Sequence, residues 1–144
     1  MVRYILDTNV LSEMFRPDPN EHVLSWIKRH DPEHLFLTVF TVGEIRMGAE
    51  KLPPGRKRTS LEGWLEDFVL PNFAGRILPF DVKAANVWAR LAANDKKNGR
   101  PRPTVDAMIA SIALSQDLSL VTRNVRDFAD IDLSLANPFE GSGG

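Results

Sequence analysis

The sequence contains no cysteine, which excludes disulfide bonds, thiol catalysis and cysteine-ligated metal sites. It also lacks any apolar run of the roughly 18 residues that a membrane-spanning helix needs. Met1 leads directly into a short apolar run, Val2 to Leu6, without the basic segment and longer apolar core of a secretory signal. We therefore expect a cytoplasmic protein that does not enter a membrane.

Neither sign of charge dominates, because 19 acidic residues stand against 18 lysines and arginines and the net charge is −1. Long-range attraction of the whole molecule to nucleic acid is therefore not expected, and any phosphate binding must be local. Two basic clusters are candidates, Arg56-Lys57-Arg58 and the group formed by Lys96, Lys97, Arg100 and Arg102. Taken alone, each cluster is more simply explained as a solvated helix end or loop.

Strand-like apolar runs alternate with longer helical patterns along the 144 residues. The runs lie at Tyr4–Leu6, Leu35–Phe40, Arg76–Phe80 and Leu118–Thr122, and a weaker fifth lies at Ile131–Leu135. This alternation predicts an α/β fold with a parallel sheet. We expect one domain over residues 1–140, followed by a flexible Gly-Ser-Gly-Gly tail at 141–144.

Most of the helical patterns are preceded by Asn, Asp or Thr, which are favoured as N-cap residues of helices. They predict helices that begin after Asn9, Asn20, Thr41, Asp81 and Thr104. The helix after Asp81 is expected to end at Gly99, because glycine tolerates the left-handed conformation that often follows a helix.

Three acidic residues lie near the predicted ends of strands, where parallel α/β proteins bind their ligands. Asp7 follows the first strand, Glu44 lies in the helix after the second, and Asp106 lies in the helix before the fourth. Each has a structural alternative. Thr41 and Glu44 fit a capping box, Asp106 can complement the positive end of a helix, and Asp7 can belong to a strand-to-helix turn.

Five stretches, in order along the chain, carry a more specific signal than any single acid. They are YILDTNVLSE at 4–13, TVGEIRMG at 41–48, ILPFD at 77–81, DAMIA at 106–110 and LVTRNVRDF at 120–128. Together they closely resemble the PIN-domain family, specifically the VapC and FitB-like toxins of toxin–antitoxin pairs. NFAGRILPF at 72–80 and NPF at 137–139 look especially FitB-like. The resemblance implies one PIN domain, a three-layer α/β/α fold with a central parallel sheet of four to five strands.

The resemblance also implies an acidic pocket that holds catalytic Mg²⁺ or Mn²⁺ through Asp7, Glu44 and Asp106. Oxygen ligands suit these hard cations, and a bound cation supplies a nucleophilic water at neutral pH. We expect Asp7 and Asp106 to be the principal direct ligands, and Glu44 to be a ligand or to orient water. Candidates for contact with the acids or the substrate are Thr8, Asn9 and Thr122.

One position departs from the family pattern. Many members carry a fourth acid directly after Thr-Arg, where this chain has Asn124. The change lowers the negative charge of the pocket and leaves open whether one or two ions bind. Asn124 can still offer a neutral oxygen or position water, and Asp127 either substitutes in part or faces solvent.

The implied function is that of a metal-dependent endoribonuclease, the toxin of a toxin–antitoxin pair. Its implied partners are RNA, a small cognate antitoxin and a second copy of the chain, with DNA bound only through the antitoxin. Two alternatives stay open. Asn124 alone favours a PIN-like binding or regulatory module without cleavage, and Asp7-Thr-Asn9 superficially resembles the Asp-x-Asp of aspartyl-phosphate phosphatases but lacks the second acid.

Overall fold

Five short strands form one fully parallel sheet in the order β3-β2-β1-β4-β5. A computed structural model describes residues 1–140, so the expected tail at 141–144 lies outside the described residues. The strands are β1 (Tyr4–Leu6), β2 (Leu35–Thr38), β3 (Ile77–Leu78), β4 (Ser119–Val121) and β5 (Leu135–Ala136). The prediction of an α/β fold with a parallel sheet is therefore confirmed.

Only β1 has the expected bounds. β3 and β4 are shorter at both ends than the expected runs, and β2 and β5 differ as follows. β2 ends at Thr38, because Val39 and Phe40 already belong to the next helix. The fifth strand does not begin at Ile131, because the backbone amides of Ile131 and Leu133 donate to local carbonyls in turns. It begins only at Leu135, where it pairs with β4.

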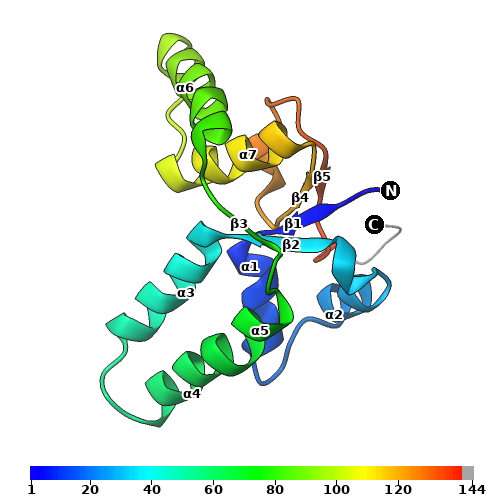
Figure 1. Cartoon of the computed structure of the whole chain (residues 1–144), viewed down its shortest axis with the longest axis vertical. Coiled ribbons are helices and arrows are strands. Elements are labelled where there is room, and N and C mark those ends of the chain that lie inside the picture. Colours follow the sequence, from blue (N-terminus) through cyan, green and yellow to red (C-terminus); the bar gives the residue numbers. More distant parts are fainter. Residues whose placement is uncertain (141–144) are drawn as a thin grey trace.

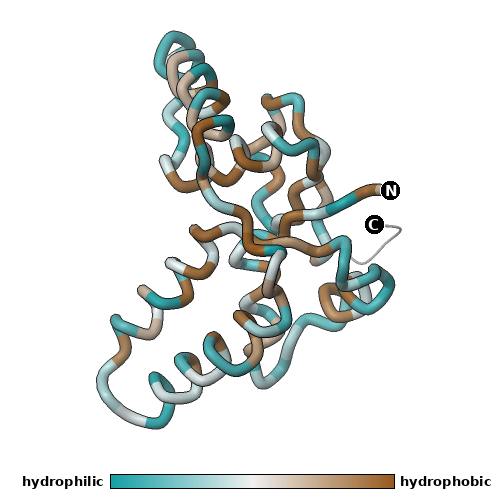
Figure 2. Tube along the Cα trace, viewed as in Figure 1, coloured by the Kyte–Doolittle hydropathy of each residue, from teal (hydrophilic) through white to brown (hydrophobic). Residues whose placement is uncertain are grey.

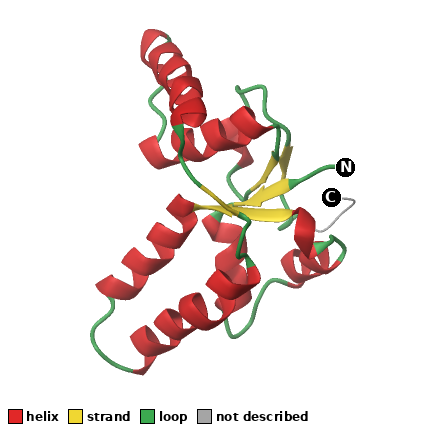
Figure 3. Cartoon of the chain, viewed as in Figure 1, coloured by secondary structure: helices red, strands yellow, loops and turns green. Residues whose placement is uncertain are grey.

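The longest helices are α3, α6 and α7, and shorter helices and turns connect the other elements (Figures 1 and 3). They are α1 (Thr8–Leu11), the 3₁₀ turns η1 (Ser12–Phe15) and η2 (Pro32–His34), α2 (Glu21–Lys28), α3 (Val39–Lys51), α4 (Arg56–Trp64), the π-helical η3 (Leu65–Val69), α5 (Leu70–Asn72), α6 (Val82–Lys97), α7 (Thr104–Gln116) and the 3₁₀ turn η4 (Val125–Phe128). None of these helices within residues 1–140 is long and apolar enough to cross a membrane.

Helices cover both faces of the sheet and give the expected three layers (Figure 1). Successive strand residues point to opposite faces. Ile5 accordingly packs with α6 and α7, whereas its neighbour Leu6 packs with α1, α2 and the α3 to α5 region. Hydrophobic residues follow the strands at the centre, and the tip between α3 and α4 is largely hydrophilic (Figure 2). The sheet therefore holds two separate core clusters, one on each face.

Two of the expected caps are confirmed and three are wrong. Asn20 and Asp81 accept hydrogen bonds from the first amides of α2 and α6. Asp7, not Asn9, caps α1, since its carboxylate accepts from the Thr8 amide. The residues that precede α3 and α7 are Thr38 and Pro103, so Thr41 and Thr104 lie inside these helices. The start of α3 therefore leaves the side chains of Thr41 and Glu44 available for other contacts.

Candidate active site

Asp7 lies at the carboxyl end of the sheet, between the ends of β1 and β4. Its backbone amide donates to the Val121 carbonyl at 2.9 Å, which fixes its position beside β4. The side chain accepts hydrogen bonds from the Thr8 amide at 2.9 Å, the Thr122 hydroxyl at 2.8 Å and the Asn9 amide at 3.5 Å. Burial raises the pKa of Asp7, and these three hydrogen bonds oppose that rise.

Every group that donates to the Asp7 carboxylate is neutral. Asp7 is only 6% exposed, and no lysine or arginine within residues 1–140 forms an ion pair with it. A buried carboxylate without a cationic partner is costly, because the low dielectric of the interior disfavours its charge. The protein therefore leaves a buried negative charge for a cation to neutralise.

Asn9 and Thr122 connect the segments that follow β1 and β4. The Asn9 side-chain oxygen accepts from the Arg123 amide at 3.1 Å, and its nitrogen lies 3.4 Å from the Thr122 hydroxyl. The same hydroxyl accepts from the Asn124 amide at 3.1 Å. Both predicted accessory residues therefore hold the surroundings of Asp7 in place.

Thr8 connects the Asp7 segment to Glu44. The Thr8 hydroxyl lies 2.6 Å from a carboxylate oxygen of Glu44 and 2.9 Å from the hydroxyl of buried Thr41. Because a hydroxyl has one proton, Thr8 donates it to Glu44 and is free to accept the proton of Thr41. The capping-box explanation of Glu44 is therefore wrong, and its carboxylate faces the segment that follows β1.

Asp106 lies in the first turn of α7, as its sequence position suggests. Burial raises the pKa of Asp106 to about 6, with further contributions from the negative charges of Asp7, Asp127 and Glu44, while Arg102 opposes the rise. Repulsion of this kind requires that the carboxylates lie near one another. The negative charges of Asp7, Glu44 and Asp127 therefore all act on Asp106, although no three acidic side chains within residues 1–140 stand close enough to form a metal-binding group.

Comparison with known proteins decides the family. The sequence profile of the PIN domain matches residues 4–133. The chain belongs to the PIN-domain family.

Individual relatives give the same result. The VapC ribonuclease Y4jK of Sinorhizobium fredii is 39% identical over 136 residues, which cover 94% of this chain and 97% of the relative. The crystal structure of FitAcB from Neisseria gonorrhoeae matches with a TM-score of 0.88 and 39% identity, covering 95% of this chain and 99% of that one. A member of the VapBC family of toxin–antitoxin systems from Mycobacterium tuberculosis, VapBC-5, matches with a TM-score of 0.71 and 26% identity, covering 95% and 99%. These likenesses confirm the expected resemblance to VapC and FitB-like toxins.

The donor set of this PIN domain fits Mg²⁺ or Mn²⁺ held in an open site. Within residues 1–140, no three acidic or histidine side chains stand close enough to form a metal-binding group by themselves. Mg²⁺ does not need such a group, since it keeps several waters and is commonly held by one or two carboxylates together with substrate phosphate. The buried, cation-free carboxylate of Asp7 and the nearby Asp106 meet that requirement.

The two residues proposed to replace the family's fourth acid differ in their surroundings. Asn124 is exposed, and among the described residues only its backbone takes part in the network around Asp7. Asp127 is also exposed, but its negative charge acts on Asp106. Its backbone carbonyl accepts a hydrogen bond from Arg102 at 2.6 Å. The placement favours Asp127 over Asn124 as the partial substitute.

Sequence reasoning missed the surroundings of three side chains. Thr41 is buried and its hydroxyl contacts that of Thr8. Glu13 is buried and accepts from the Asn20 amide at 2.8 Å. Arg102, which looked like part of a solvated cluster, has only 6% of its side chain exposed. The helical spacing of four residues between Thr41, Ile45 and Ala49 could have indicated that Thr41 is buried. The partners of Arg102 carry no such local signal, because they lie 7 to 28 residues away in sequence.

Proposed function

We propose that this chain is a divalent-metal-dependent endoribonuclease that acts as the toxin of a toxin–antitoxin pair through one domain, residues 1–140. The observation that supports this most directly is the buried Asp7 carboxylate, which has neutral donors only and lies near Glu44 and Asp106. Such a carboxylate group suits a cation that in turn binds a phosphodiester.

Mg²⁺ or Mn²⁺, when bound, supplies a water activated for attack and offsets the negative charge of the phosphate. Asp7 and Asp106 are the residues that would hold the cation. Glu44, whose carboxylate oxygen is fixed by Thr8 at 2.6 Å, would orient water. Thr122 and Asn9 keep the Asp7 oxygens in position through hydrogen bonds at 2.8 and 3.5 Å.

A small antitoxin is the cognate partner of this toxin, RNA is its substrate, and DNA contact occurs through the antitoxin. The relative named VapC ribonuclease Y4jK supports RNA as the substrate, and the VapBC-5 structure supports an antitoxin partner; the contact with DNA follows from the family resemblance. We further propose that the toxin forms a homodimer, as the family resemblance implies. Growth arrest on expression, relieved by a small antitoxin gene next to this one, is the expected outcome in cells.

The alternatives have less support. The phosphatase alternative needs an acid at position 9, but Asn9 stands there and holds the Arg123 amide. The binding-module alternative depends on Asn124, whereas the charge of Asp127 reaches Asp106 in its place.

Cleavage of single-stranded RNA by the purified chain tests the proposal. We expect cleavage with Mg²⁺ or Mn²⁺, none after chelation, and a loss of about 100- to 1,000-fold in Asp7→Asn, as lost charge stabilisation of several kcal/mol implies. Asp18→Asn is the matched control, because Asp18 is an exposed acid between two prolines outside the site. Cleavage that survives chelation, or full activity in Asp7→Asn, would contradict the metal mechanism. RNA binding without cleavage would favour the binding module.

A further inference from the structure

The two basic clusters, which could not be distinguished from the sequence, differ in their surroundings in the structure. In the first cluster, Arg58 is engaged by Glu50 at 3.0 Å, Glu62 at 3.6 Å and the Leu52 carbonyl at 3.4 Å. Residues of the second cluster line a hollow beside the start of α7, the helix that carries Asp106. The second cluster therefore lines a surface with space for a ligand, and Pro103, Thr104 and Ala107, which flank Asp106 in sequence, line the same surface.

This hollow consists of two adjoining pockets of about 400 Å³ and about 360 Å³, which share Gly99 to Arg102. We call the two pockets together the Arg100 groove. The smaller pocket is lined by Arg126 and Asp127, and the charge of Asp127 reaches Asp106. The larger pocket is lined by Trp88, Lys96 and small apolar side chains of α6 and α7. The groove thus leads away from the carboxylates toward an aromatic wall.

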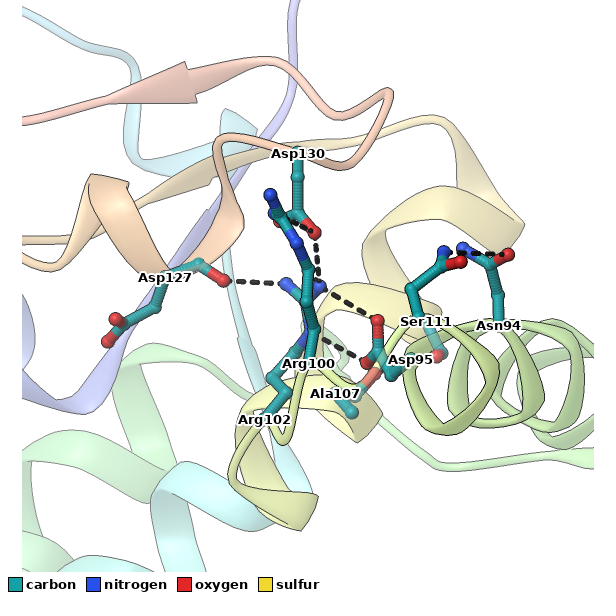
Figure 4. A network of polar contacts seen from close by, with 9 residues as sticks. Asn94, Asp95, Arg100, Arg102, Ala107, Ser111, Asp127 and Asp130 are labelled. Carbon is teal, nitrogen blue, oxygen red and sulfur yellow. Dashed lines mark hydrogen bonds and ion pairs between the residues drawn. The ribbon is translucent and has the colours of Figure 1, made fainter.

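Arg102 lines both pockets of the Arg100 groove and connects α6 to the segment after η4 (Figure 4). Its guanidinium donates to both oxygens of Asp95 on α6 at 3.0 and 3.1 Å, and to Asp130 after η4 at 2.9 and 3.1 Å. A further bond, at 2.6 Å, reaches the Asp127 carbonyl. The walls are therefore set by a buried network and do not depend on a bound ligand.

The same network determines which charges remain for a ligand. Asp95 and Asp130, two of the three acids that line the groove, are occupied by Arg102, and Asp130 is also paired with Arg100 at 3.2 Å. Arg126 is exposed and forms no ion pair within residues 1–140, and the Arg100 side chain is 65% exposed. Lys96 and Arg126 therefore remain without an ion pair among the described residues, Asp127 is the one lining acid left unpaired there, and the groove keeps a small net positive charge.

We propose that the Arg100 groove binds the single-stranded RNA segment next to the cleaved bond, with Arg100, Arg126 and Lys96 at its phosphates and Trp88 beside a base. Positively charged grooves that also offer an aromatic side chain are the usual way in which proteins hold single-stranded nucleic acid. The inference rests on the proposed nuclease function, because continuity with the acidic site is what selects RNA as the occupant.

Equilibrium binding of labelled single-stranded RNA to the Asp7→Asn protein tests the inference without cleavage. We expect Arg100→Gln/Arg126→Gln to weaken binding about tenfold at moderate salt. The slope of log K against log salt concentration should become shallower by about 1.4, because two phosphate contacts are lost. Lys28→Gln/Arg29→Gln is the matched control, since it removes equal charge from exposed residues at the end of α2, which lies apart from α6 and α7 in Figure 1. It should change the salt dependence little.

A second variant tests the apolar wall. Trp88→Leu should weaken RNA binding about five- to a hundredfold through lost stacking while leaving the salt dependence unchanged. Trp88→Phe should restore most of the affinity, and thermal unfolding of both variants checks that the fold is intact.

Each outcome bears on one proposal. Wild-type affinity and salt dependence in the Arg100/Arg126 double variant would overturn the inference, even if that variant had lost antitoxin binding. Absence of metal-dependent cleavage in the unmodified chain would instead contradict the proposed function. A double variant with weakened RNA binding supports the groove whichever result the cleavage assay gives.

Discussion

Asp7 and Asp95 are buried to nearly the same degree, 6% and 7% exposed, but only Asp95 has a cationic partner among the described residues. Arg102 binds both oxygens of Asp95 at 3.0 and 3.1 Å, so that charge is neutralised inside the fold. Asp7 receives hydrogen bonds only from an amide, a hydroxyl and a carboxamide. One carboxylate is therefore neutralised by a cationic side chain of the fold, and the other has no cationic partner among the described residues, as the proposed metal site requires.

The difference has an energetic consequence. A buried ion pair with several additional hydrogen bonds can compensate the cost of removing two charges from water, whereas neutral donors compensate only part of it. Burial accordingly raises the pKa of Asp7. The acidic site is thus a region where local stability is given up for binding, and the Arg102 network is the region that holds the neighbouring loops in place.

Removal of the Arg102 charge should produce the largest loss of stability. We expect Arg102→Met to lower the free energy of unfolding by about 3–5 kcal/mol, because buried Asp95 then has no cation. Arg46→Met, which removes an exposed pair with Glu66, should change it by at most about 1 kcal/mol. Chemical denaturation measures both. Equal effects in the two variants would mean that burial of the Arg102 network contributes nothing.

Replacement of each buried aspartate by asparagine tests the comparison directly. Asp95→Asn should destabilise the metal-free protein by about 1.5–3 kcal/mol, the range for hydrogen bonds to a charged group. Asp7→Asn should instead leave the metal-free protein as stable or slightly more stable at neutral pH, because it removes an uncompensated charge. Thermal unfolding in chelator measures both, and a loss in Asp7→Asn as large as that in Asp95→Asn would contradict the distinction.

The Thr8 hydroxyl is expected to affect activity more than stability. Thr8→Val removes the donor that fixes Glu44 at 2.6 Å while keeping a similar side-chain volume. We expect a 10- to 100-fold loss of RNA cleavage, typical of groups that orient metal ligands or metal-bound water. Thr8→Ser, which keeps the hydroxyl, should retain most of the activity. A Thr8→Val protein with wild-type kcat would exclude Glu44 orientation from the mechanism.

The acidic residues of the candidate site are easier to recognise in the sequence than the network beside them. Asp7, Glu44 and Asp106 are recognisable because each lies within a local motif, and the parallel sheet brings the three motifs to one edge. Arg102 carries no such local signal, since its partners lie on α6 and in the loop after η4. A charge cluster looks the same in sequence whether it is solvated or buried.

Helix starts show the same limit on a smaller scale. Asn20 and Asp81 cap the helices that they were expected to cap, because nothing distant competes for their side chains. Thr41 has the local pattern of a cap, but its hydroxyl contacts Thr8, 33 residues away. Contacts between strand ends therefore override the local preference at the site, and only the folded chain shows them.

Metal binding should depend on pH through Asp106. The pKa of Asp106 in the metal-free protein is about 6, above its ordinary value near 4. The metal-free fold therefore loses stability as pH rises through this range, while the deprotonated carboxylate becomes available to a cation. At 10 to 100 times its Kd, Mg²⁺ should stabilise the protein by about 1.4–2.7 kcal/mol at about pH 7.5 and by less at about pH 5. Thermal unfolding with and without Mg²⁺ measures the difference, with Asp18→Asn as control. An equal effect of Mg²⁺ at both pH values would mean that Asp106 does not bind the cation. Asp7 would then be the one carboxylate of the proposed metal site that differs in this way from Asp95, the carboxylate paired with Arg102.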